Sequence, residues 1–136
     1  MTISDWKRSI YALLALPAFA AGPRVQRRLA ARLMGTTVRE GPPRPFASAG
    51  LALLAWPFAV LIWYLVGRIA TYGLLWDEAT AGASWGGPSL TGAWIVHFCC
   101  ALGMVVPVMW LLRPLTAAQA GLLSGRVGTE MGVPST

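Results

Sequence analysis

An apolar stretch from Phe46 to Trp76, whose one formally charged residue is Arg68, constrains this chain more than any other feature. About 20 residues, rising 1.5 Å each, suffice for a helix to cross a hydrocarbon core of roughly 30 Å. A helix on the surface of a soluble protein would carry a polar face, and this stretch has none. It therefore predicts a membrane-spanning helix that is long enough to tilt or to extend past the bilayer.

A second stretch, Leu90 to Leu112, contains no Asp, Glu, Lys or Arg and predicts a second span, which Arg113 and Pro114 would end. The chain of 136 residues is 56% hydrophobic and 12% charged, and that charged fraction is about half of what soluble domains usually carry. We therefore predict an all-α integral membrane protein with two transmembrane helices.

Lysine and arginine are unevenly distributed around the two predicted spans. The loop 77–89 between the spans has neither residue, and the flanking segments carry Lys7, Arg8, Arg24, Arg27, Arg28, Arg32, Arg39, Arg44, Arg113 and Arg126. Because cytoplasmic segments are enriched in these residues, both termini are predicted to lie in the cytoplasm and the loop outside the cell membrane. The net charge of +6 then favours anionic lipid headgroups as a partner over nucleic acid.

The N-terminal segment contains a shorter apolar run, 9–21, which Pro17 interrupts. The run is too short to span a membrane and predicts an interfacial or re-entrant helix bent at the proline, starting near Trp6 with Ser4 or Asp5 as its cap. A signal peptide is the alternative, but the basic sequence that follows opposes export.

A basic segment, Pro23 to Met34, follows and predicts an amphipathic helix that ends at Gly35. Val25, Leu29 and Leu33 recur every four residues and would share a face. Its arginines are candidates for binding lipid headgroups on the cytoplasmic side: Arg24, Arg27, Arg28 and Arg32. An ordinary solvated face is the alternative. A proline-rich linker follows, which divides the chain into a segment 1–45 and a two-span domain 46–136 with a cytoplasmic tail.

Several segments together resemble the sensor domain found at the N-terminus of many actinobacterial sensor histidine kinases. The similar segments are DWKRSIYALLALP, RRLAARLMG, LLAWPFAVLIWYLVGRIATYGLLW, SWGGPSLTGAWIVHF and VMWLLRPLTAAQAGLL. The resemblance covers most of the chain from Asp5 to Leu123 and implies signal input at a membrane, as in two-component signal transduction. The family usually has two helix pairs that each span twice. Here the first pair is shortened, and no kinase segment follows Arg126.

Two polar residues within the predicted spans are candidates for an intramembrane site. Arg68 lies eight residues before Trp76, and an ionisable group inside a span indicates function by default. It either meets an internal partner or extends to the outer headgroups near Asp77 and Glu78. Alternatively, the span starts and ends earlier, near Gly67, which would leave Arg68 at the interface. His97, the one histidine, lies at a similar depth in the second span and is expected to bond to the neighbouring helix.

The outer loop, with Asp77, Glu78 and Trp85, is the candidate for perceiving a signal. No spacing predicts a catalytic set, a metal site or a cofactor, so we expect neither an enzyme nor a bound cofactor. The adjacent Cys99 and Cys100 have no partner for a disulfide framework.

The sequence thus favours a small membrane protein that is a signal-input or accessory component working through protein partners. A structural subunit of a larger membrane complex is the alternative, and a small pore element lined by Arg68 and His97 is a third. Because two spans make a thin bundle, Trp63 and Tyr64 in mid-membrane predict a homo-oligomer or association with other membrane subunits.

Overall fold

The computed structural model describes residues 1–35, 44–83 and 85–124. Four α-helices make up most of this part of the chain: α1 (Ile3–Ala20), α2 (Pro23–Met34), α3 (Pro45–Thr71) and α4 (Leu90–Ser124). Two short 3₁₀ helices, η1 (Tyr72–Leu75) and η2 (Glu78–Ala83), follow α3. The described residues contain no strand, so the predicted all-α class is confirmed for them.

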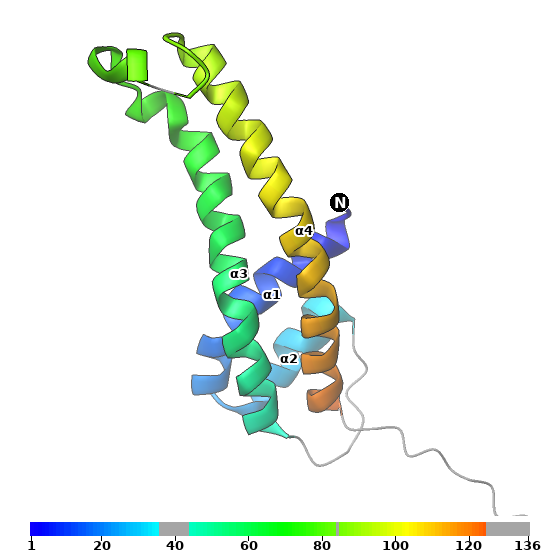
Figure 1. The fold of residues 1–136 in the computed structure, drawn as a ribbon. Helices are drawn as coiled ribbons and strands as arrows, with labels where there is room; N and C mark the ends of the chain where they lie inside the picture. Colours follow the sequence, from blue (N-terminus) through cyan, green and yellow to red (C-terminus); the bar gives the residue numbers. More distant parts are fainter. Residues whose placement is uncertain (36–43, 84, 125–136) are drawn as a thin grey trace, which may run out of the picture.

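Helices α3 and α4 form a long antiparallel hairpin, and α1 and α2 cross its lower half (Figure 1). The upper half of the hairpin extends beyond α1 and α2 as two helices alone. Two segments, Phe46–Leu74 and Leu90–Leu123, are long and apolar enough to cross a membrane. Only 28% and 22% of their most apolar windows are buried inside the protein, so most of their surface faces outward.

The main core lies where α1 crosses the hairpin. It is built from small side chains, Ala12 of α1 with Ala55 and Ala59 of α3, together with larger apolar side chains from Ile62 of α3 and Met109 of α4. Ala55 and Ala59 are both fully buried. Small residues at the crossing let α1 lie directly on α3.

A second, smaller core joins α2 to the lower end of the hairpin. Tyr11 of α1, Ala30 of α2 and Leu123 of α4 are its buried members, with Leu29 and Leu33 packed against them. The start of α3 is tied to the end of α4 by the Arg44 amide, which donates to the Leu122 carbonyl at 3.3 Å.

Burial of Tyr11 makes the second core sensitive to alkali. The ring is 1% exposed, and burial raises the pKa of Tyr11 from 10.0 to about 12. Because the unfolded chain ionises first, stability is full below about pH 10 and falls as the pH rises toward 12. In a Tyr64→Phe/Tyr72→Phe protein, whose single tyrosine is Tyr11, we expect the phenolate absorbance to appear near pH 12. A midpoint near 10 would mean that the ring is solvated.

The structure corrects three boundaries or faces predicted from sequence. Helix α1 begins at Ile3 rather than near Trp6, because Asp5 lies in its first turn and accepts a bond from the Thr2 amide at 2.8 Å. Helix α4 continues through Pro114 instead of ending there. The Leu112 carbonyl accepts a bond from the Thr116 hydroxyl at 2.7 Å, and the Arg113 carbonyl accepts one from the Arg8 guanidinium.

The third correction concerns the buried face of α2, whose bounds and left-handed Gly35 cap match the prediction. Gln26 and Ala30 are its buried residues, whereas Val25 is 43% exposed. The buried face is rotated from the predicted one because α2 packs against α1 and α4.

One aromatic side chain predicted to need another subunit has a partner within the chain. The Trp63 ring meets Trp6 of α1 edge to face, with their centroids 5.8 Å apart. Tyr64 is 61% exposed.

Candidate functional site

Arg68 and His97 are brought together through Tyr72. The Arg68 guanidinium lies 5.6 Å from the centroid of the Tyr72 ring, and that ring lies 4.7 Å from the His97 ring. Tyr72 is buried between α3 and α4. The two polar residues therefore both contact Tyr72 in the upper half of the hairpin.

The hydrogen bond of His97 is made within its own helix rather than to α3. Its Nδ1 is 2.7 Å from the carbonyl oxygen of Ala93, one turn earlier. A carbonyl can only accept, so Nδ1 carries the proton. The prediction of a bond to the neighbouring helix is wrong, and the ring stack on Tyr72 takes its place.

A second tie joins the helices nearby. The Trp94 indole nitrogen of α4 donates to the Ile69 carbonyl of α3 at 3.1 Å. This carbonyl lies in the last turn of α3 and also accepts a bond from the Tyr72 backbone amide. The bond and the Tyr72–His97 stack together hold the upper ends of the two helices against each other.

Arg68 is exposed, and the structure pairs it with no carboxylate among the described residues. Its contact is a cation–π one with a residue of its own segment, one turn on. This geometry agrees better with a side chain that extends outward than with one that has an internal ionic partner.

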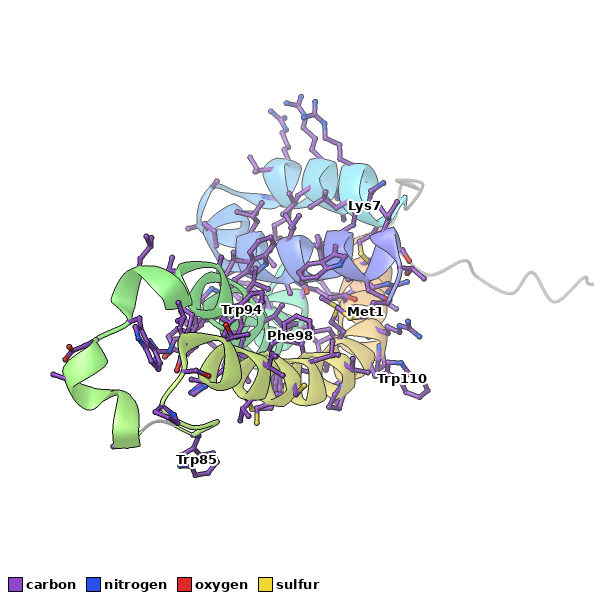
Figure 2. The ribbon with its side chains drawn as sticks, turned by 90° about the horizontal axis from the view of Figure 1, so that it is seen from above. Met1, Lys7, Trp85, Trp94, Phe98 and Trp110 are labelled. Carbon is purple, nitrogen blue, oxygen red and sulfur yellow. The ribbon has the colours of Figure 1, made fainter. Side chains whose placement is uncertain are left out.

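The outer loop presents Trp85 to the surroundings, because this side chain is 77% exposed (Figure 2). Asp77 is exposed and its carboxylate accepts a bond from the Ala79 amide at 3.0 Å. The side chain of Glu78 lies outside the described part of the structure.

A second polar cluster, which we call the clamp, joins α1 to α4 and was not predicted from sequence. It consists of Asp5 and Arg8 of α1 with Arg113 and Thr116 of α4. Arg113 donates from Nε and Nη2 to the two carboxylate oxygens of Asp5, at 2.8 and 2.9 Å. Arg8 donates from Nη1 to the Arg113 carbonyl at 3.2 Å and to the Thr116 hydroxyl at 3.3 Å.

The two members of the ion pair differ in burial. Asp5 is 3% exposed, whereas the Arg113 side chain is 42% exposed and lies over the Trp110 ring. Hydrogen bonds from Arg113 and from the Thr2 amide hold the pKa of the Asp5 carboxyl well below its usual value, against the opposing effect of burial. The carboxylate is therefore charged at every physiological pH, and the clamp is a permanent ion pair.

This depressed pKa makes stability depend on acid. The unfolded chain takes up the Asp5 proton near pH 3.8 and the folded chain only below that value, so stability is full above this range and falls as the pH drops through it. We expect the melting midpoint to fall from about pH 5 to pH 3 more steeply in the wild type than in Asp5→Asn. The other carboxyl groups contribute equally to both proteins. Parallel curves would contradict the depressed pKa.

A sequence signal for the clamp exists in retrospect. Asp5 and Arg8 are three apart on one helix, as are Arg113 and Thr116 on the other, and residues at this spacing share a face. Each pair therefore indicates a polar helix face that contact with another polar face would stabilise. What the spacing lacks is any indication that α1 and α4 meet.

The basic face of α2 points away from the rest of the protein. Figure 2 shows side chains with nitrogen at their tips projecting from the far side of this helix. Arg24, Arg28 and Arg32 are exposed, and Arg27 is half-buried. Three of the four arginines predicted to bind headgroups are thus available on the surface.

No group of three or more His, Cys, Asp or Glu residues within the described ranges could hold a metal ion. Cys99 and Cys100 are both exposed thiols on α4. No family model matches the chain, and neither does any curated protein or solved structure.

Proposed function

We propose that this protein is an integral membrane protein that acts as a signal-input or accessory component through protein partners. In this proposal α3 and α4 cross the cell membrane, both termini are cytoplasmic and the loop with Trp85 lies outside. The outward-facing apolar surface of both helices supports it, as does the absence of Lys and Arg between them. The resemblance to a sensor domain of histidine kinases points in the same direction.

The clamp is the observation that carries this proposal. Two charge-assisted bonds fix α1 to α4, and the second core fixes α2 to both of these helices. A displacement of α4 would therefore move the α1–α2 hairpin with it. The route runs from the outer loop along α4 to Arg113, across to Asp5, and on to the exposed arginines of α2.

Site-specific crosslinking in living cells tests the proposal. A photo-reactive amino acid at Arg28, exposed on α2, is expected to capture a protein partner. The same amino acid at Leu54, which is 59% exposed on α3, is the control for random encounters in the membrane. Introducing Asp5→Asn is expected to change the capture at Arg28 only. Absence of capture at Arg28, or capture that ignores the clamp, would refute this route.

A structural subunit of a larger membrane complex is the second candidate. The large exposed aromatic side chains on the candidate spans favour it, among them Phe46 at 82%, Trp110 at 68% and Tyr64 at 61%. This function predicts a complex of fixed stoichiometry that survives mild detergent and is indifferent to Asp5→Asn. Mass measurement of the solubilised complex, with and without that substitution, separates the two candidates.

A further inference from the structure

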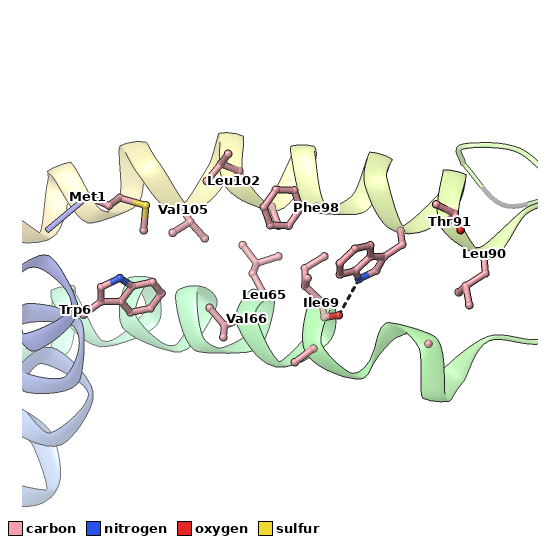
Figure 3. A pocket seen from close by; sticks show the side chains of 14 residues that line it. Met1, Trp6, Leu65, Val66, Ile69, Leu90, Thr91, Phe98, Leu102 and Val105 are labelled. Carbon is pink, nitrogen blue, oxygen red and sulfur yellow. Dashed lines mark hydrogen bonds between the residues drawn. The ribbon is translucent and has the colours of Figure 1, made fainter. Parts of the chain in front are cut away.

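Buried polar side chains gather in the lower half of the hairpin, where α1 and α2 pack against it. Among the described residues, Tyr72 is the one buried residue between Ser48 of α3 and Thr116 of α4 that carries a hydroxyl, amide or charged group. The upper half instead carries an apolar groove of about 680 Å³, whose lining includes Phe98 of α4 and Leu65 of α3 (Figure 3). The lower half therefore has to satisfy polar groups that folding removes from water.

Four buried side chains of the lower half, one from each helix, carry polar atoms that bond to no other atom in the described part of the chain. They are Tyr11 of α1, Gln26 of α2, Ser48 of α3 and Gln119 of α4. Each is exposed by 2% or less. The atoms are both hydroxyl oxygens and the oxygen and nitrogen of both amides. Such groups lose their hydrogen bonds with water on folding, so they need another partner in the core.

Three of these side chains surround the second core. Tyr11 is itself one of the buried members of that core. Gln26 lies four residues before Ala30 on α2, and Gln119 lies four residues before Leu123 on α4. Because residues four apart share a helix face, both glutamines lie beside the buried members of the core.

Ser48 approaches the same region from α3. Its amide donates to the Arg44 carbonyl at 3.0 Å, and the Arg44 amide donates to the Leu122 carbonyl of α4. Ser48 therefore lies one turn along α3 from this contact, at about the level of Gln119 on α4. The buried Thr116 hydroxyl bonds to a carbonyl of its own helix at 2.7 Å. The Ser48 hydroxyl makes no such bond within the described ranges and can bond to a partner in the core.

The chemistry of the four side chains identifies this partner. Hydroxyl and amide groups both donate and accept, and none of the four is charged, so a neutral molecule that does both is the best match. Exposed fractions of 2% or less leave no opening for a molecule larger than water. We propose that the four side chains hold about two internal water molecules, because a buried water makes about three hydrogen bonds. These waters connect all four helices, whereas the clamp connects α1 to α4.

The side-chain amide signals in an NMR spectrum report on this site alone, because the chain has no asparagine and Gln26 and Gln119 are its two glutamines. In the full-length protein in deuterated detergent, we expect both amides to show cross-peaks to water with the sign of a long-lived contact. Arg28→Gln adds one exposed amide as the control, which should show only the weak contact of surface water. The cross-peaks should persist in Tyr11→Phe/Ser48→Ala, which lacks the hydroxyl protons that exchange with water. Their absence from the wild type, or their loss in that variant, would overturn the proposal.

Gln119→Leu tests the waters through stability, because leucine is apolar and similar in size to glutamine. If water joins the four groups, this change leaves the others with too few partners and should lower the melting midpoint by roughly 5 °C. An amide without any partner would instead make the protein more stable when removed, so a higher midpoint would overturn the proposal. Gln26→Leu/Gln119→Leu should lower the midpoint by less than the sum of the single changes, because either change displaces shared water. Additive effects would show that the two amides share none, against the proposal.

Discussion

Arg113→Gln is expected to destabilise the protein more than Asp5→Asn, although each removes the same ion pair. Arg113→Gln leaves a carboxylate that is 3% exposed without its main partner, and water cannot replace the lost bonds. Asp5→Asn leaves an arginine that is 42% exposed and can be solvated. We expect the melting midpoint in detergent to fall by roughly 10 °C for Arg113→Gln and by about half as much for Asp5→Asn.

The double variant Asp5→Asn/Arg113→Gln completes the test as a thermodynamic cycle. Because the buried charge is gone, its midpoint should lie above that of Arg113→Gln alone. Arg28→Gln, which removes an exposed arginine from α2, is the control and should change the midpoint little. Additive effects of the two single changes would show that Asp5 and Arg113 do not act as a pair.

The parts of the fold that follow from local sequence could be predicted. A helix from Pro23 to Met34 is specified by a proline at its first position and a glycine at its end, and the structure has these bounds. The two apolar helices follow from hydropathy alone, because length and composition decide whether a helix can cross a membrane.

The clamp could not be predicted, because it depends on how distant helices meet. Asp5 and Arg113 are 108 positions apart, and no local pattern states that α1 lies across α4. The sequence suggested that Arg113 and Pro114 end the second span. That interpretation missed a continuous helix, in which Thr116 and Arg8 donate to the carbonyls around the proline.

The stack at Arg68 was predicted only in part, because it also depends on how two helices meet. Arg68 and His97 lie at a similar depth in adjacent helices, which indicated that they would lie near each other. Both contact Tyr72, as this expectation requires. The direction of each side chain depends on helix rotation, which apolar helices without a polar face do not specify. His97 consequently bonds to Ala93 of its own helix rather than to α3.

Gly86→Ala is expected to disrupt the packing of the outer loop on α4, with little effect on the rest of the protein. Gly86 has φ +107°, where side chains are strained, and an added Cβ would overlap the backbone carbonyl of Gly92. This close approach holds the loop against the first turn of α4. There, the Ala93 amide donates to the Ser89 carbonyl at 3.1 Å and the Gly92 amide to the Ser89 hydroxyl at 3.2 Å.

Amide hydrogen exchange measures the effect at the turn itself. Strain of about 1–3 kcal/mol should speed exchange at Gly92 and Ala93 by roughly tenfold or more, while α1 is unchanged. Gly82→Ala is the matched control, because this glycine has open space around it and no positive φ. Equal exchange in the two variants would mean that the loop does not depend on the Gly86–Gly92 contact.

If the exposed Trp85 perceives a signal, Gly86→Ala should abolish the response while leaving the clamp intact, since the two sites lie at opposite ends of the candidate span in α4.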